Sequence, residues 1–213
     1  EMARIMSIVM AVFIIVPAVA PAIGQGIILI SGWRATFGLL LLLAIATFIW
    51  FAIRQPETLA IAARRKFSLA NVGSGIAEIC HIRTATGYTL GAGLIFGAFL
   101  GYLSSAQQVF QVAYKTGSYF PVYFGIAAIA IGAASVVNAK LVLGLGMRFL
   151  AHRAATGITI ISFLFLIPVV LFSGVPPLML FMTWLLFTFF GMGILFGNLN
   201  ALAMEPLGHM AGL

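Results

Sequence analysis

The segment Thr36–Ile53, TFGLLLLLAIATFIWFAI, decides the solvent in which this protein folds. It contains eleven Leu, Ile or Phe residues and no charged side chain. At about −0.3 to −0.6 kcal/mol each, these residues contribute about −3 to −7 kcal/mol to the insertion of a helix into a lipid bilayer. Arg34 precedes the segment, where its long side chain can reach the headgroups. Trp33 and Trp50 lie near the two ends, where interfacial aromatic anchors are common. The segment therefore predicts a transmembrane helix.

The composition of the whole chain agrees with a membrane protein. Its 213 residues are 63% hydrophobic and 7% charged, whereas a soluble domain is about 25% charged. Eleven basic and four acidic side chains cannot cover the surface of a soluble protein of this length. The net charge of +7 does not indicate nucleic-acid binding, because the basic residues are scattered between apolar runs and form no stripe. The single cysteine, Cys80, excludes an intrachain disulfide and a cysteine metal cluster.

Six segments are long and apolar enough to cross a bilayer, which requires about 20 residues. We therefore predict an all-α, polytopic membrane protein. The six segments are Ile5–Ile30, Thr36–Ile53, Tyr88–Ala113, Phe120–Val137, Ala155–Ser173 and Leu178–Leu199. Residues 54–87 form the one long connection, which is the natural boundary between two membrane bundles. The other connections are short and predict antiparallel neighbours.

The connections alternate in charge. Two basic residues, Arg34 and Lys115, fall on one side of the predicted membrane, and nine fall on the other. The nine are Arg4, Arg54, Arg64, Arg65, Lys66, Arg83, Lys140, Arg148 and Arg153. Because short loops rich in Lys and Arg stay in the cytoplasm, both ends of this sequence are predicted to be cytoplasmic.

The first span contains the unusual stretch PAVAPAIGQG, residues 17–26. At about 100° per residue, Pro17, Ala20, Pro21 and Gly24 fall on one face of a helix. Proline bends a helix by breaking its hydrogen-bond ladder, and small residues let a second helix approach closely. The stretch thus predicts a kinked, tightly packed helix. The alternative is that Pro and Gly are simply more frequent in membrane helices than in soluble ones.

Two spans carry glycines at helical spacing, which predicts close helix packing. These glycines are Gly93, Gly97 and Gly101 in the third span and Gly191, Gly193 and Gly197 in the sixth. Asn138 and Asn198 lie near predicted cytoplasmic helix ends. They are expected either to cap a helix or to form a hydrogen bond between helices.

A narrow polar stripe follows the glycines of the third span. It consists of Ser104, Gln107, Gln108 and Gln111. Their side chains point within about 100° of one another on a helix. Such a stripe in a membrane helix faces protein or a water-filled cavity, so two roles stay open: hydrogen bonds to a neighbouring helix, or the wall of a substrate cavity. The sequence shows no histidine pair with metal-ligand spacing, and we predict no metal site.

The order of several sequence stretches along the chain is informative about the family. PAVAPAIGQG is followed by the turn GWRATF, a Leu-rich helix and RQPETL; then come GYLSSAQQVFQ, FPVYFGIAAIAIGAASVVNAKLV and GNLNALAMEPLGHMAG. This order resembles helices five to ten of the major facilitator superfamily, and within it the bicyclomycin-resistance type of drug:proton antiporters. The antiporter motif of that family is of the type Gly-Pro-x-x-Gly-Gly. Pro21 and Gly24 match it, while Ala20 and Gln25 replace its first and last glycines.

The resemblance implies a twelve-helix fold of two bundles, of which this sequence is a part. Residues 1–53 would be the last two helices of the N-terminal bundle, and residues 54–87 a cytoplasmic loop between the bundles. Residues 88–213 would be the first four helices of the C-terminal bundle and the start of a fifth. The proton-coupling carboxylate is expected in N-terminal helices beyond this sequence, because none of the six spans contains an acidic residue.

The same resemblance implies proton-coupled efflux of drug-like small molecules by a monomer in the bacterial inner membrane. The proton gradient is the driving force, and no cofactor is expected. A carrier for a sugar or another metabolite is the alternative, and the glutamines of the third span favour it. A membrane-embedded enzyme is disfavoured because the spans offer Ser and Thr but no base. A structural subunit without transport activity is a further alternative.

Overall fold

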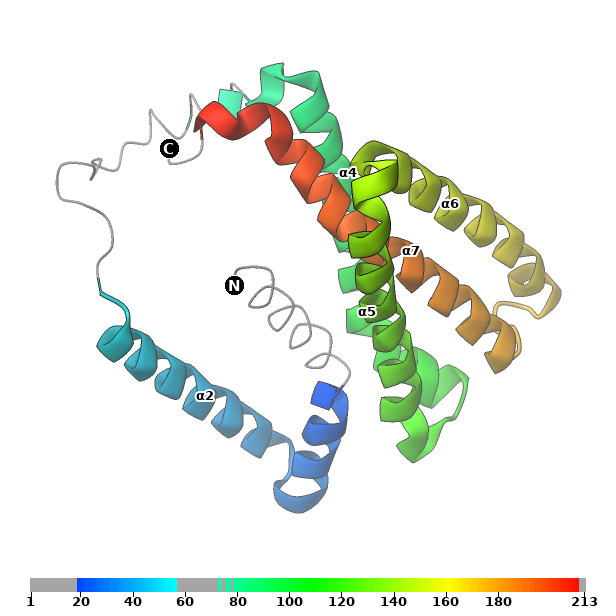
Figure 1. Cartoon of the computed structure of the whole chain (residues 1–213). Coiled ribbons are helices and arrows are strands. Elements are labelled where there is room, and N and C mark those ends of the chain that lie inside the picture. Colours follow the sequence, from blue (N-terminus) through cyan, green and yellow to red (C-terminus); the bar gives the residue numbers. More distant parts are fainter. Residues whose placement is uncertain (1–18, 57–72, 74–75, 78, 211–213) are drawn as a thin grey trace.

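A computed structural model describes residues 19–56, 73, 76–77 and 79–210, with side chains as far as Leu207. All regular structure in these residues is helical (Figure 1). The main elements are a helix over Val19–Ser31, α2 (Trp33–Arg54), α4 (Arg83–Gln108), α5 (Phe120–Leu145), α6 (Met147–Leu171) and α7 (Leu178–Met204). A π-helical segment, Val109–Ala113, follows α4, and short 3₁₀ helices cover Gly117–Tyr119 and Glu205–Met210.

Five of the described helices are long and apolar enough to span a membrane. They cover Trp33–Arg54, Arg83–Ala113, Gly117–Leu145, Met147–Leu171 and Leu178–Leu207. The prediction of an all-α, polytopic membrane protein is therefore confirmed. The remaining predicted span, Ile5–Ile30, lies largely outside the described residues; its described part belongs to the apolar helix Val19–Ser31.

Four predicted boundaries are wrong by five residues or more, and in each case the helix is longer than expected. α4 begins at Arg83 rather than Tyr88, α5 ends at Leu145 rather than Val137, α6 begins at Met147 rather than Ala155, and α7 ends at Met204 rather than Leu199. Lys140, Arg148 and Arg153 therefore lie on helical turns and not in a loop. Hydropathy marks only the part of a helix inside the hydrocarbon core, whereas backbone hydrogen bonding continues the helix into the headgroup region.

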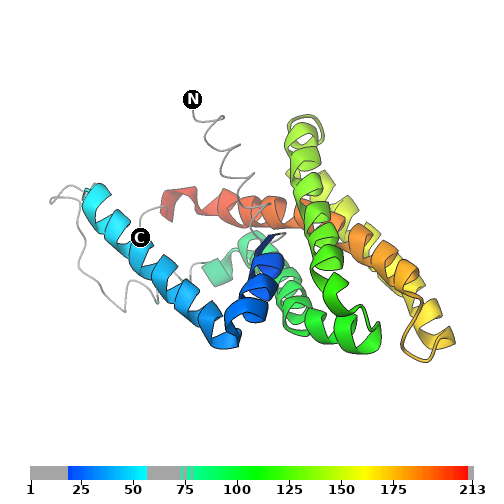
Figure 2. The same cartoon turned by 90° about the horizontal axis from the view of Figure 1, so that it is seen from below.

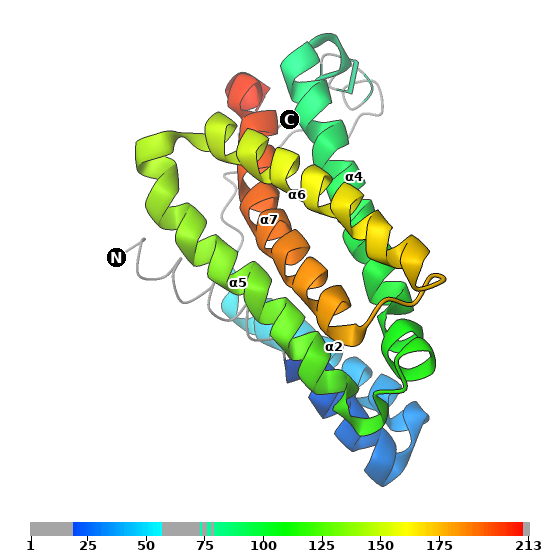
Figure 3. The ribbon, with the colours of Figure 1, turned by 90° about the vertical axis from the view of Figure 1, so that its right-hand side faces the viewer.

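Helix α7 is the centre of the fold, because it packs against α4, α5 and α6 (Figure 3). It contributes twelve buried residues, whereas α4, α5 and α6 contribute two, four and two. Those eight are almost all small: Ala85, Ala106, Ala127, Ala128, Gly132, Ala134, Leu150 and Ala151. The large side chains of α7 thus pack against small-residue surfaces on its neighbours. Such close packing matters in lipid, where no hydrophobic effect drives helices together.

Aromatic rings fill much of the remaining space between these helices. Phe110, fully buried after α4, stacks on Tyr123 of α5 with ring centroids 5.8 Å apart. Trp184 of α7 stacks on Phe165 of α6 at 4.8 Å, and its Nε1–H donates a hydrogen bond of 3.2 Å to Ser162 Oγ. The indole thereby satisfies its only donor while its ring packs, as a buried tryptophan requires.

A surface ion pair joins the beginning of α6 to the segment that follows α7. Arg148 Nη2 lies 3.1 Å from Glu205 Oε2, and the two side chains are 69% and 51% exposed. An exposed pair of this kind contributes at most about 1 kcal/mol, so the packing of α6 against α7 depends mainly on apolar and aromatic contacts.

The two N-terminal helices meet at Gly32, whose φ of 77° suits glycine. No residue of α2 is buried, and the pair lies to one side of the α4–α7 group (Figure 2). The whole apolar surface of α2 is therefore available to lipid or to other helices.

Gly146 is the turn between α5 and α6, with φ of 81°. We expect Gly146→Ala to destabilise the complete protein by about 1–2 kcal/mol, because a Cβ strains the left-handed conformation. Gly144→Ala is the control: Gly144 lies in the last turn of α5, and an added Cβ there meets nothing within 4 Å. The Gly144→Ala substitution should leave the stability of the protein unchanged or raise it. Thermal unfolding in detergent measures the difference, and equal effects of the two substitutions would contradict it.

Candidate functional site

Helix α4 has two faces of opposite character. Ala106 is fully buried, and so is Phe110 in the π-helical segment that follows. Ser104 lies about 200° around the helix from Ala106, and it is exposed, as are Gln107 and Gln108, while Gln111 is half-buried. The predicted polar stripe is thus brought together, and it points away from the face that packs against α7.

The hydrogen bonds of the stripe stay within its own helix. Gln107 Nε2 donates to Gln111 Oε1 at 3.3 Å, and Ser104 Oγ donates to Leu100 O at 2.9 Å. Among the described residues, no hydrogen bond from the stripe reaches a second helix. The amide groups therefore keep hydrogen-bonding capacity toward whatever faces them.

The glycine ridge continues the same face of α4. Gly93, Gly97 and Gly101 are exposed, and an added Cβ at any of them meets nothing within 4 Å. Their packing role stays a prediction, since no helix of the described part covers them. From Gly93 to Gln111 the ridge and the stripe form one strip about 27 Å long at 1.5 Å per residue. We call this strip the outer face of α4; it consists of Gly93, Gly97, Gly101, Ser104, Gln107, Gln108 and Gln111.

The outer face ends in the π-helical segment, Val109–Ala113, which contains Gln111. Tyr114 N–H donates to Val109 O at 3.1 Å, and Thr116 donates to Phe110 O through both its N–H and its Oγ1, at 3.0 and 2.9 Å. π-type turns of this kind are common at the carboxyl ends of helices, so the segment by itself does not indicate a functional site. No proline or glycine marks this segment, so it could not be predicted from the sequence.

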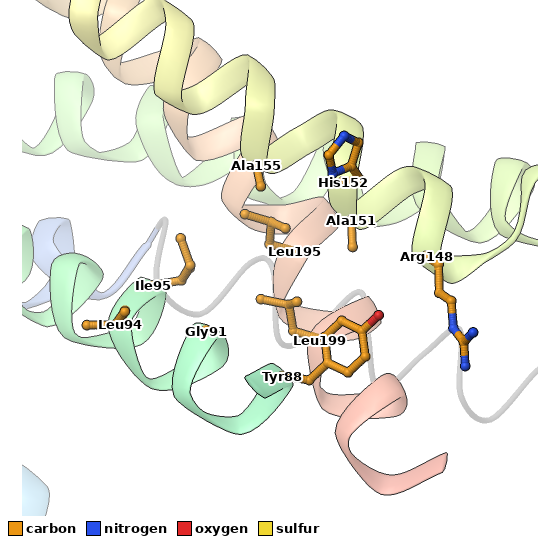
Figure 4. A pocket seen from close by; sticks show the side chains of 10 residues that line it. All are labelled: Tyr88, Gly91, Leu94, Ile95, Arg148, Ala151, His152, Ala155, Leu195 and Leu199. Atoms are coloured by element: carbon orange, nitrogen blue, oxygen red, sulfur yellow. The ribbon is translucent and has the colours of Figure 1, made fainter. Parts of the chain in front are cut away.

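A second candidate is an apolar groove of about 380 Å³ between α4 and α6, with α7 as its floor (Figure 4). It is lined by Tyr88, Gly91, Leu94, Ile95, Arg148, Ala151, His152, Ala155, Leu195 and Leu199. Ile95 lies about 180° around α4 from Ser104, so the groove and the outer face are on opposite sides of the helix. Its few polar groups do not converge on one point, with Arg148 at one end of the groove, which makes it the weaker candidate.

The proline–glycine motif lies in the helix Val19–Ser31. Ala20 is exposed and Pro21 and Gly24 are half-buried. An added Cβ at Gly24 meets nothing within 4 Å. Pro17 lies outside the described residues. The structure thus shows no close approach of another helix at Gly24 in the part that it describes, and the predicted close packing stays a prediction.

The glycines of α7 lie inside the α4–α7 group. An added Cβ at Gly193 would be 2.6 Å from Ile131 O of α5, and one at Gly191 would be 2.6 Å from Ile158 Cγ1 of α6. At Gly197 the nearest atom, Asn138 Nδ2, is 4.0 Å away. Gly193 and Gly191 therefore allow close approach of two different helices, and Gly197 is not tightly packed.

Three shielded hydroxyls were not singled out from the sequence as site residues. Thr36 Oγ1, Tyr102 Oη and Thr188 Oγ1 have no hydrogen-bond partner among the described residues, and neither does the shielded Gln25 Oε1 of the proline–glycine motif. A polar atom inside an apolar run was the only available signal for them. Outside the spans, burial raises the pKa of Tyr114, so this phenol stays protonated at neutral pH.

The spans and the outer face of α4 define a polytopic α-helical membrane protein in which one helix presents an uncharged polar surface away from its own bundle. The chain matches the Major Facilitator Superfamily over residues 1–213. It therefore belongs to this superfamily, whose members are transporters.

One curated relative gives a closer comparison. The chain is similar to a bicyclomycin resistance protein homolog of Haemophilus influenzae, with 25% identity over 217 residues. The alignment covers 100% of this chain and 53% of the relative, so the chain spans about half the length of the relative that it matches. No solved structure matches the chain.

Proposed function

We propose that this chain is part of a proton-coupled exporter of drug-like small molecules in the bacterial inner membrane. The observation that carries the proposal is the outer face of α4, a polar strip in a membrane span that no described helix covers. Membership of a transporter superfamily supports it, as does the similarity to a protein named for bicyclomycin resistance. We further propose a monomer with both ends of this chain in the cytoplasm.

In this proposal the outer face is one wall of a central cavity, and a second bundle is the opposite wall. Rocking of the two bundles about a site near the bilayer midplane exposes the cavity to each side in turn. Gln107, Gln108 and Gln111 offer amide donors and acceptors without charge. A few such groups in a largely apolar site orient a substrate and still accept varied shapes.

The proton-coupling group lies elsewhere in this proposal. Glu205 is the only acidic residue whose side chain the structure describes, and it is 51% exposed and paired with Arg148 at the end of α7. Proton coupling needs a carboxylate that titrates inside the membrane. We therefore assign it to the remainder of the protein, as the resemblance to drug:proton antiporters implies.

A carrier for a sugar or another metabolite is the second candidate. The three glutamines favour it, because amide side chains suit a substrate with many hydroxyl groups. In that case the complete protein would transport a labelled sugar and would not confer drug resistance.

Substitution of the stripe tests the proposal. We expect Gln107→Leu in the complete protein to lower drug efflux from energised cells about tenfold, because loss of one well-placed polar contact costs about 1–3 kcal/mol. Dye and antibiotic accumulation, with and without a protonophore, is the measurement.

Thr159→Val is the matched control for this test. Thr159 is an exposed polar residue of α6 whose Oγ1 donates to its own helix, to Ala155 O at 2.9 Å. It should leave efflux within twofold of the wild type. Unchanged efflux in Gln107→Leu, or an equal loss in Thr159→Val, would reject the outer face as the cavity wall. Efflux that survives the protonophore would reject proton coupling.

A further inference from the structure

Two asparagines join α5 to α7 inside the membrane-spanning group. Asn198 Nδ2 donates to Asn138 Oδ1 at 2.6 Å, and also to Ile194 O of its own helix at 3.0 Å. Asn198 is 2% exposed and Asn138 is half-buried. Lys140 lies two residues after Asn138, so the bond lies at the boundary of the apolar layer, where the burial of Asn198 shields it from water.

The contact between α5 and α7 that surrounds this bond is made by small residues. An added Cβ at Gly193 would lie 2.6 Å from Ile131 O and 2.7 Å from Ala134 Cβ. The two helices run in the same direction. Along α5, Ile131 comes before Asn138, and along α7 their partners come in the same order, Gly193 before Asn198. Ile131 and Asn138 lie within about 20° of each other around α5, whereas Gly193 and Asn198 lie about 140° apart around α7.

Small residues and the amide pair make different contributions. A glycine–alanine surface permits close approach, but it has few protruding side chains that would stop one helix from sliding or rotating along the other. A hydrogen bond is directional, and its energy falls steeply with misalignment. A single buried asparagine is also a known means of fixing helix register in coiled coils. The pair therefore supplies the register that the small residues do not.

We infer that Asn138 and Asn198 form a positioning clamp, which holds α5 and α7 in one register so that they move as a single body during transport. The inference rests on the proposed transport function for its consequence, but the clamp itself is a property of the helix pair. The clamp contains no ionisable group, so a proton gradient does not open it.

The test uses four variants of the complete protein: Asn138→Leu, Asn198→Leu, the double variant, and Asn200→Leu. Asn200 is the matched control, since it lies two residues further along α7, is exposed, and donates only to Phe196 O of its own helix. Hydrogen exchange of the purified protein, measured by mass spectrometry, reports the cytoplasmic ends of α5 and α7 and needs no substrate. Transport rate and KM are measured separately.

Each single variant should speed exchange at these two helix ends about fivefold or more, while Asn200→Leu should not. The double variant should regain thermal stability, because replacing both partners by apolar groups leaves no unpaired polar atom. It should nevertheless keep the fast exchange and a maximal transport rate lowered about fivefold, with KM within twofold of the wild type.

Wild-type exchange in the double variant would overturn the clamp, and so would equal exchange in Asn200→Leu and Asn198→Leu. If Asn198→Leu does not accumulate, exchange in Asn138→Leu decides, because Asn138 is the less buried partner. If the wild type transports none of the compounds offered, the proposed function fails while the exchange result still decides on the clamp.

Discussion

Gly193→Leu is expected to abolish assembly of the α4–α7 group. The first side-chain atom alone would lie 2.6 Å from a backbone oxygen, Ile131 O, and 2.7 Å from Ala134 Cβ. Backbone cannot move aside as a flexible side chain can, so the leucine must separate α5 from α7. The yield of folded protein after detergent extraction, measured by size-exclusion chromatography of a fluorescent fusion, should fall to background.

Two alanine variants show how strongly the stability of the protein depends on the space at each glycine. Gly193→Ala should destabilise the protein by about 1–3 kcal/mol, the usual cost of overpacking. Gly197→Ala, one turn further along α7, adds a Cβ whose nearest neighbour is at 4.0 Å, and it should change stability by less than about 1 kcal/mol. A Gly193→Leu protein that extracts and unfolds like the wild type would show that α5 and α7 are not in close contact in the membrane.

Cysteines at positions 115 and 153 are expected to react from opposite sides of the membrane. Lys115 lies in the connection between α4 and α5, Arg153 lies in the first turns of α6, and both side chains are exposed. One complete span, α5, separates the two positions. A membrane-impermeant maleimide added to intact cells should therefore label Lys115→Cys almost completely and leave Arg153→Cys unlabelled.

The background for this labelling must lack Cys80, which is exposed. Inverted vesicles are the control and should show the reverse pattern. Labelling of both positions from the same side would remove the predicted orientation and the placement of α5 as a span. Labelling of Arg153→Cys alone in intact cells would keep the span but invert the topology.

Hydropathy predicted the existence of the membrane helices but not their full lengths. The runs of Leu, Ile and Phe mark the hydrocarbon core directly, which is why both ends of α2 were placed within three residues, whereas α7 continues five residues beyond its predicted end. The predicted ends of α5 and α6 failed because Lys140, Arg148 and Arg153 suggested a loop. Long basic side chains extend into the headgroup region from helical turns, so charge marks the membrane boundary and not the helix end.

Some features of the candidate site follow from local sequence spacing, and others depend on which helices pack together. The stripe of Ser104 and the glutamines follows from helical spacing alone, and the structure places it on one face. The bond from Asn198 to Asn138 was one of two open alternatives, because spacing cannot show which helices are neighbours. The π-helical segment had no local signal, since it depends on where Phe110 finds its packing partners. Among the described residues nothing lies within 4 Å of an added Cβ at Gly24 or on the ridge of α4, so the close packing predicted for these glycines stays a prediction.

The central place of α7 has a consequence for biogenesis. The ribosome delivers α4, α5 and α6 to the bilayer before α7, and domains form progressively as the chain emerges. Until α7 inserts, Ala106 and Ala127 lack the Met, Leu and Phe side chains of α7 that pack against them in the folded protein. The three earlier helices thus lack most of their packing until α7 inserts, although Phe110 can already stack on Tyr123 of α5. Their consolidation is a late and concerted event, so a chain truncated before Leu178 should be recognised by quality-control proteases as an orphan.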